Sequence, residues 1–402
     1  MNLFRFWTLR VGPSLGGIVM MRALTLATLL FSTTWAAAAP TPTVNCDRGQ
    51  SLNAALAKMN KFSPATVVFT GTCTEYVIVN GFDELTLTGV QGATIQQPNT
   101  TPPPNPAFVL SVKASRSVTL SGFAVHSQAS VFSCIGIVGG STDIMLRDIT
   151  TDGAWGIVID EASQAWIVRA TVNLAYGYAA IALFDQSDAH IVDGLLQRRA
   201  SSGFNAGLLV ESGHATVQGL TIRDMQQSIN VNSSGSVDVS HFDPSGAGVN
   251  VIIDNPSGNN YYGALVSDGS SLNISSAKLL ITNAGQPWGG DTGGVLVTNG
   301  STLSAGSSLV VSGSQSQGVV VSNNSHAEFG GSSITGSAHG GLVVANLSTA
   351  TAHSSNPLTV IGSNGTDLFC DSRSQIAGTL NIANAGVVSC NNLIPGIYQS
   401  LP

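Results

Sequence analysis

Charged side chains recur at a regular interval in the middle of this chain. Asp148, Arg169 and Asp193 follow one another at intervals of 21 and 24 residues, and residues 143–243 hold 17 of the 37 charged side chains. Two carboxylates with room for a water molecule between them are the groups that inverting glycoside hydrolysis requires. The spacing therefore suggests a catalytic role for these three residues. The alternative is an exposed ladder of ion pairs, which contributes little to stability.

A second set of acidic residues has a similar spacing but no cation between its members. Glu161, Asp185 and Glu211 stand 24 and 26 residues apart, although Glu211 requires a turn that is one residue shorter. Stacked carboxylates must splay into water, take up protons or bind a cation. Calcium accepts carboxylate oxygens in flexible geometry, so the set is a candidate Ca²⁺ site. The alternative is that water and salt screen the exposed charges.

Aromatic and arginine side chains gather in the insertions between repeating segments. Exposed rings beside polar groups suit sugars, because they offer a flat apolar face next to hydrogen-bonding partners. Insertions of a stacked repeat protein fall on one edge, so we expect these residues and the charged stack to line one groove. The longest insertions are residues 242–263 and 282–293. The alternative is that the rings pack beneath their own loops. The candidate substrate-binding residues are Trp155, Tyr176, Tyr178, Arg198, Arg199, Tyr261, Tyr262 and Trp288.

These intervals follow from an apolar pattern that repeats along the chain. Residues 206–222 contain three pairs of apolar residues separated by small polar turns, and Ala215 of this segment has counterparts at Ala165, Ala189 and Val237. One repeat is too short to bury its apolar side chains alone, but stacked repeats can pair strand on strand in parallel. The sequence therefore predicts an all-β solenoid with three strands per turn. Because neighbouring strands lie about 4.8 Å apart, residues two repeats apart stand roughly 9–10 Å apart.

Several features give the chain a resemblance to the right-handed parallel β-helix, or pectin-lyase-like, superfamily. They are the repeat, the opening segment VNCDRGQSLNAAL, an amphipathic helix expected over residues 51–61, and Asn299, Asn323 and Asn346 at one position of the repeat. Those asparagines would stack as a hydrogen-bonded ladder or stand as solvated turn residues. The resemblance implies a single right-handed parallel β-helix solenoid of about 11 to 12 turns. The helix would cover its first turn.

The resemblance implies a polysaccharide or surface glycan as ligand but matches no single enzyme family. The Asn-Thr-Asp, Gly-His-Gly and Arg-Ile-Lys runs of polygalacturonases are absent, as are the Trp-Ile-Asp-His run of pectate lyases and the Gln-Asp-Thr run of pectin methylesterases. An arginine serves as the base in some lyases of the superfamily, which adds a lyase interpretation for Arg169. We therefore expect a carbohydrate-binding or scaffold protein. A polysaccharide lyase or glycoside hydrolase is the alternative, and an adhesin-like surface protein is the second.

The N-terminal segment predicts export. Met21 and Arg22 precede a thirteen-residue apolar run and the small residues 36–39, which is typical of a signal peptide. That run is too short to span a bilayer, and no later segment is expected to span one. The expected organisation is a signal peptide over 1–38, a cap segment with the helix over 39–65, the β-helix over 66–392 and a tail over 393–402.

Cysteine, histidine and net charge narrow the partners. Outside the cytoplasm, whether secreted or periplasmic, Cys46 could pair with Cys73 and Cys370 with Cys390, each bond contributing roughly 3 kcal/mol. Cys134 is left as a buried small side chain. A net charge of −7 with four lysines argues against nucleic acid and anionic membranes, and we expect a monomer. The three histidines of the central region occupy different positions of the repeat, so no shared metal is expected: His190, His214 and His241.

Overall fold

The computed structural model describes residues 42–99, 108–128, 133–175, 177–199, 205–242, 250–255, 261–286, 292–306, 308–383, 388–390 and 398–401. The described residues belong to one compact unit, Thr41–Pro402. The expected signal peptide lies outside the described residues. Among the described residues, no helix has the length and apolar character needed to cross a bilayer.

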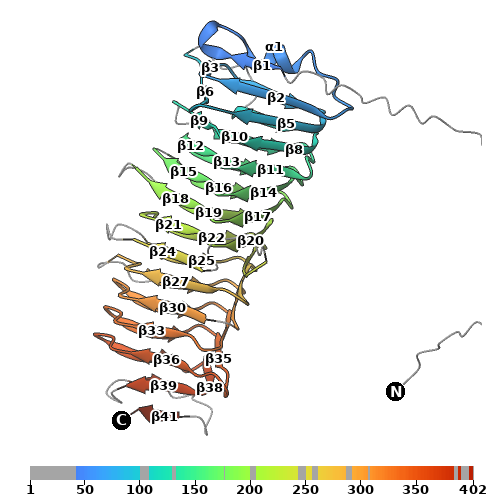
Figure 1. The fold of residues 1–402 in the computed structure, drawn as a ribbon. Coiled ribbons are helices and arrows are strands. Elements are labelled where there is room, and N and C mark those ends of the chain that lie inside the picture. Colours follow the sequence, from blue (N-terminus) through green and yellow to red (C-terminus); the bar gives the residue numbers. More distant parts are fainter. Residues whose placement is uncertain are drawn as a thin grey trace, which may run out of the picture. The chain divides into compact units, whose positions relative to one another are not determined.

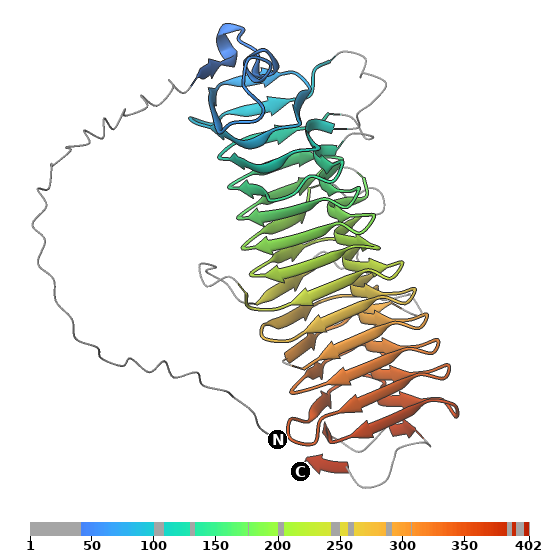
Figure 2. The same cartoon turned by 90° about the vertical axis from the view of Figure 1, so that its right-hand side faces the viewer.

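The described chain is a parallel β-solenoid of about 12 turns, as the sequence predicts. Its strands form three sheets of 14, 14 and 13 strands, here called sheets A, B and C, and every neighbouring pair within them is parallel. The chain visits the sheets in turn, so the strands of one sheet stack in a column along the solenoid (Figures 1 and 2).

The strands have the following bounds. Sheet A contains β1 (Thr43–Asn45), β2 (Ala65–Thr70), β5 (Asp83–Gly89), β8 (Arg116–Ser121), β11 (Ile144–Arg147), β14 (Gln164–Val168), β17 (Asp188–Val192), β20 (His214–Gln218), β23 (Ser236–Val239), β26 (Ser271–Ile274), β29 (Thr302–Ala305), β32 (His326–Phe329), β35 (Thr349–Ala352) and β38 (Gln375–Gly378). Sheet B contains β3 (Thr72–Thr74), β6 (Thr94–Gln96), β9 (Ala124–His126), β12 (Thr150–Gly153), β15 (Thr171–Leu174), β18 (Leu195–Arg198), β21 (Thr221–Arg223), β24 (Val251–Asp254), β27 (Lys278–Thr282), β30 (Ser308–Ser312), β33 (Ser333–Thr335), β36 (Leu358–Ile361), β39 (Leu380–Ala383) and β41 (Tyr398–Leu401). Sheet C contains β4 (Val77–Asn80), β7 (Phe108–Lys113), β10 (Ser133–Val138), β13 (Trp155–Ile159), β16 (Ala179–Leu183), β19 (Ala206–Glu211), β22 (Gln227–Asn232), β25 (Tyr262–Val266), β28 (Gly293–Val297), β31 (Gln317–Val321), β34 (Gly340–Val344), β37 (Thr366–Cys370) and β40 (Val388–Cys390).

The core is a set of columns of inward side chains. Ala165, Ala189 and Ala215 lie level with one another in β14, β17 and β20, and each is at most 2% exposed. This is the interior column that the repeat predicts. The sheets extend beyond the predicted β-helix segment at both ends, because β1 pairs with β2 and β41 pairs with β39. Strands therefore lie within the segments expected to be cap and tail.

The corner between sheets C and A carries two polar ladders. The side chain of Asn346 donates to Asn323 (3.1 Å), Asn323 donates to Asn299 (3.3 Å), and Asn299 donates to Asp268 (2.9 Å). The asparagine ladder is therefore confirmed, with an aspartate at its end. A buried ladder of serine hydroxyls beside it, which sequence analysis missed, accepts backbone N–H groups from turn to turn in two series: Ser115, Ser141, Ser163 and Ser187, and Ser301, Ser325, Ser348 and Ser374.

The helix at the start of the chain is shorter than predicted. A 3₁₀ turn, η1 (Cys46–Arg48), precedes α1 (Leu52–Leu56), which contacts β2 and β4 and buries Leu52 and Leu56 in the main core. The N-terminus of α1 is held by Glu75, whose carboxylate accepts the backbone N–H of Leu52 (2.6 Å) and the hydroxyl of Ser51 (2.8 Å). The helix ends early because the next turns form only shorter-range bonds.

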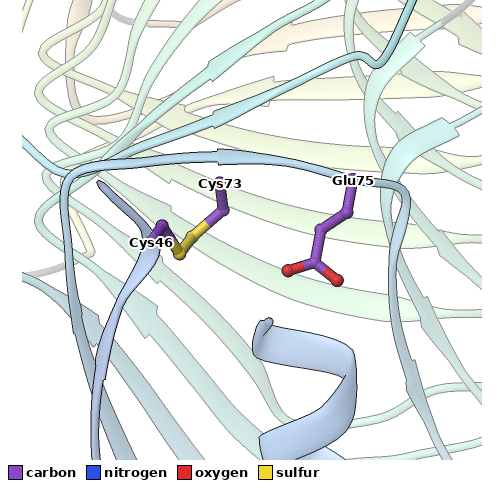
Figure 3. Close-up of side chains that lie close together, drawn as sticks. All are labelled: Cys46, Cys73 and Glu75. Carbon is purple, nitrogen blue, oxygen red and sulfur yellow. A yellow bond between two sulfur atoms is a disulfide. The ribbon is translucent and has the colours of Figure 1, made fainter. Parts of the chain in front are cut away.

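Both predicted disulfides are present. Cys46 is bonded to Cys73, and Cys370 to Cys390. Glu75 lies beside the first bond, as Figure 3 shows, and the two sulfurs and its carboxylate are within 4.8 Å of one another. Because both sulfurs are in the disulfide, and the carboxylate is hydrogen-bonded to α1, this group is a crosslinked helix cap rather than a metal site. Cys134 is buried, which raises the pKa of its thiol to about 12.

Candidate functional site

A cleft of about 560 Å³ opens where sheet A strands turn into sheet B. Two of the predicted catalytic residues, Arg169 and Asp193, line it, whereas Asp148 reaches it only through its contact with Arg169. The cleft extends over the sheet B strands β15, β18, β21 and β24. These strands follow one another along the solenoid, as Figure 1 shows. Its lining residues are Arg169, Ala170, Thr171, Asp193, Gly194, Leu195, Gly219, Thr221, Asn250 and Ile252.

The floor of the cleft is one outward column of sheet B. Thr171, Leu195, Thr221 and Ile252 lie level with one another on neighbouring strands, so hydroxyl and aliphatic side chains alternate along the solenoid. Ile252 is 39% exposed, although it is a large apolar residue. The floor is therefore an open surface with regularly spaced apolar and hydrogen-bonding groups.

The wall of the cleft is built from the first residue of each two-residue turn. Asp148, Arg169 and Asp193 all have φ near +54°, in the left-handed region, and glycines occupy the same place at Gly122 and Gly219. Only glycine adopts this conformation without cost, and aspartate tolerates it better than most residues. The alignment of the two aspartates is thus partly a backbone requirement. Gly219 places no side chain on the wall.

Arg169 is committed to Asp148. Its Nε donates to Asp148 Oδ1 (2.7 Å) and its Nη2 to Oδ2 (2.8 Å), while both side chains remain half exposed. This bidentate bond holds the pKa of Asp148 below its ordinary value and raises the pKa of Arg169. A general acid must carry a proton to donate, and an arginine can act as a general base only after it has lost its own proton. The pair therefore disfavours both catalytic roles and leaves two hydrogen-bonding groups of fixed charge.

The acidic set at the corner between sheets C and A is split. Glu161 and Asp185 stand at the same position of neighbouring turns, but Glu211 lies one residue earlier, in β19, and accepts from Asn232 (3.3 Å). Glu211 therefore does not complete the predicted column. Asp160 lies beside the column of Glu161 and Asp185. Burial, together with the charges of Asp185 and Glu161, raises the pKa of Asp160. Calcium binding at this corner stays a prediction.

Some of the candidate aromatic residues are exposed, as sugar binding requires, and others pack against the protein. Tyr178 is 57% exposed and stacks on Trp155, with ring centroids 5.4 Å apart. Trp155 packs on a small apolar cluster on the outside of sheet C, so it is partly a structural residue. Tyr261 is exposed, and Tyr262 lies in β25. Of the other four candidates, Arg198 ends β18, Arg199 forms an ion pair with Asp152, and Tyr176 and Trp288 are outside the described residues.

The charged stack and the aromatic residues do not line one groove, although the described aromatic candidates lie at one corner, between sheets B and C. The segment 242–263 is interrupted by β24, so Asn250 lies at the corner between sheets A and B, and Tyr261 lies at the corner between sheets B and C. The charged wall and the aromatic residues therefore stand at opposite ends of the sheet B strands. Between them runs a polar outward column, in which Gln197 donates to Asn173 (2.6 Å).

Sequence analysis missed a cluster on the outer face of sheet A. His214 Nδ1 lies 2.7 Å from Asp188 Oδ1, His214 Nε2 lies 3.2 Å from Asp238 Oδ2, and His190 Nε2 lies 3.7 Å from Asp188 Oδ2. Hydrogen bonding to Asp188 raises the pKa of His214 and in return lowers the pKa of Asp188. Two of the three histidines, His190 and His214, thus lie beside the same aspartate. Positions directly before and after an inward residue share the outer face of a strand.

No protein-family model matches the chain, and no curated protein matches it. Solved structures similar to this chain include the catalytic domain of a GH87 alpha-1,3-glucanase in complex with nigerose, at 12% identity and a TM-score of 0.39. A variant of that domain in complex with tetrasaccharides has the same identity and TM-score. In each case the match covers 91% of this chain and 69% of the other.

Proposed function

We propose that this protein binds carbohydrate, and that a polysaccharide lies across the outer face of sheet B. The observation that carries the proposal is the cleft, whose floor alternates Thr171, Leu195, Thr221 and Ile252. Sugars present apolar C–H faces beside hydroxyls. A floor that repeats aliphatic and hydroxyl side chains therefore offers a contact to each kind of group. The polar wall supplies the few oriented contacts that specificity requires.

The charges of the wall favour binding over hydrolysis. Asp148 is held as a carboxylate by Arg169, so it lacks the proton that a general acid must donate. A polysaccharide lyase or glycoside hydrolase remains the second candidate, because Asp148 and Asp193 stand two turns apart, roughly 9–10 Å, near the separation used in inverting hydrolysis. An adhesin-like surface role would use the same face for attachment.

We place the protein outside the cytoplasm. The disulfide Cys46–Cys73 lies at one end of the solenoid and Cys370–Cys390 at the other. Such bonds persist in oxidising compartments. A polysaccharide would be met there as a cell-surface or extracellular polymer. A glycan-binding protein without an enzymatic role would serve there as a scaffold or an attachment surface.

The test is a calorimetric titration with a panel of neutral and acidic polysaccharides. Thr221→Trp fills the floor of the cleft and should abolish binding of whichever polymer the wild type binds. Ser333→Trp is the matched control, because Ser333 occupies the same outward column of sheet B several turns away. Equal binding by both variants, or no binding by the wild type to any polymer, would overturn the proposal.

The same samples separate a binder from an enzyme. A binding protein releases no new reducing ends and no unsaturated products from the polymer that it binds. Turnover that is lost in Asp193→Ala and retained in Ser333→Trp would establish the second candidate instead.

A further inference from the structure

A second and smaller cleft, of about 180 Å³, lies on the outer face of sheet A. Its residues come from three successive turns, at the starts of β11, β14 and β17, and none of them lines the cleft on sheet B. Its lining residues are Thr142, Asp143, Gln164, Ala165, Trp166, Asp188 and His190. The volume is well below the roughly 300–1,000 Å³ of clefts that bind drug-sized ligands, so a single small ring is the appropriate size of ligand.

The polar groups of this cleft form one column. Gln164 lies level with Asp188, and Asp143 stands at the same position of the preceding turn, because the residues that follow them, Ile144 and Ala165, are paired. Two steps between neighbouring strands separate the carboxylates by roughly 9–10 Å, with an amide between them. One metal ion cannot bind both carboxylates at that separation, since calcium–oxygen distances are about 2.4 Å. A ring that carries hydroxyls on both sides can span them.

Both carboxylates already have hydrogen-bonding partners in the neighbouring strands. Asp188 is hydrogen-bonded to His214 (2.7 Å), and His190 lies 3.7 Å from it. Asp143 accepts the hydroxyl of Ser117 (2.7 Å), whereas the nearby Arg116 is paired with Asp83. A small cation would therefore gain little here, and an anion would meet two carboxylates. Neutral donors such as sugar hydroxyls are the groups that these acceptors still favour.

The apolar side of the cleft is a fixed aromatic ring. Trp166 stacks on His190, with ring centroids 4.3 Å apart and planes 24° apart, and Phe242, which follows β23, packs against both rings. A ring held by neighbours on two sides presents its remaining surface without loss of rotamer freedom on binding. Carboxylates, an amide and an immobile indole beside a ring-sized space are a chemically complete set for one sugar ring.

We propose that this cleft binds a single pyranose ring of a neutral sugar, through hydrogen bonds to Asp143, Gln164 and Asp188 and contact with the edge of Trp166. The site is separate from the cleft on sheet B and shares with the proposed function only the class of ligand. A terminal sugar or a side branch of a bound polymer has the size that the cleft accepts.

The experiment follows the indole N–H signal of Trp166 in ¹⁵N-labelled protein, identified from its loss in Trp166→Phe. The probes are the methyl glycosides of glucose, galactose and mannose, each in both anomeric forms. At least one should shift the signal saturably, and Gln164→Ala and Asp188→Asn should each weaken that binding about tenfold, as expected for lost hydrogen bonds to oriented or charged groups. Thr221→Trp should leave the titration unchanged.

Three results would overturn the proposal. The signal does not move with any of the glycosides, it moves equally in Gln164→Ala, or CaCl₂ moves it and the glycosides do not. Gln164 is exposed, so its substitution tests recognition without disturbing the fold. Loss of polysaccharide binding in Thr221→Trp concerns only the cleft on sheet B, so failure of one site is distinguishable from failure of the other.

Discussion

At the scale of single residues, the backbone explains much of what the charge pattern suggests. Asp148, Arg169 and Asp193 share a left-handed turn position, where an arginine costs about 1–2 kcal/mol relative to glycine. A column of aspartates can therefore arise because the turn favours aspartate, with no catalytic requirement. Function has to be read from what the side chains then contact.

Replacing Arg169 separates stability from binding. Arg169→Gly loses a half-exposed ion pair but also loses the strain of the turn, so the free energy of unfolding should stay within about 1 kcal/mol of wild type. Polysaccharide affinity should nevertheless fall, because a wall residue of the cleft is gone. Chemical denaturation and calorimetry measure the two effects. Gln91→Gly, at another left-handed position, is the control and should bind normally.

The cluster around His214 should make stability depend on pH. The folded-state pKa of His214 is raised by Asp188 and Asp238, so its contribution is complete below the ordinary histidine pKa and is lost as pH rises through the raised value. Because the folded-state pKa of Asp188 is lowered, Asp188 contributes stability at pH values above its ordinary pKa. This contribution is lost as the pH falls through the lowered pKa. The melting temperature of His214→Gln should thus approach that of wild type in alkaline solution. His126→Gln serves as the control, and a constant difference at every pH would contradict this account.

Calcium binding at the acidic corner is testable one residue at a time. Asp185→Asn should abolish millimolar Ca²⁺ binding, because Asp185 and Glu161 stand at the same position of neighbouring turns. Glu211→Gln should retain it, because Glu211 occupies a different position and contacts Asn232. Calorimetric titration decides. Binding that disappears in Glu211→Gln and persists in Asp185→Asn would contradict the register described here.

At the scale of elements, α1 depends on a residue from the following turn of the solenoid. Glu75→Gln should lower the free energy of unfolding by about 1–2 kcal/mol, because the charged acceptor of the Leu52 N–H and the Ser51 hydroxyl is lost. Glu84→Gln, an exposed substitution of the same kind, should have little effect. A metal chelator should change neither protein. Equal stabilities for the two variants would argue against the cap.

The elements also explain which parts of the site could be predicted. The N-cap Ser51 is recognisable because it precedes a helical pattern, but Glu75 is some two dozen residues away and only the stacked turns bring it there. The sheet B strand β24 has four residues within a long insertion, so the sequence reads as one loop where the structure has two corners. Asp188, His190 and His214 lie together because the residues before and after an inward residue both point to the outer face of the strand. The repeat pattern alone assigns these residues to different positions.

At the scale of the whole molecule, the repeat predicts the solenoid because only parallel stacking buries so many short apolar segments. Interior columns and the asparagine ladder follow from counting residues between repeats, and both disulfides follow from the positions of the cysteines near the two ends of the solenoid. The outer surfaces do not follow, because outward residues are free of the packing constraint that fixes the inward ones. Both clefts arise on outward faces, where small side chains beside larger ones leave space.

The central claim is that polysaccharide lies on the outer face of sheet B, and hydroxyl-radical footprinting in the presence of the bound polymer tests it most directly. Modification of Leu195 and Ile252 should fall at saturation, because both lie on the floor of the cleft. The exposed residues Ile78 and Leu347, which belong to other parts of the solenoid, should be modified as before. Unchanged modification of Leu195 and Ile252 while the polymer is bound would contradict the claim.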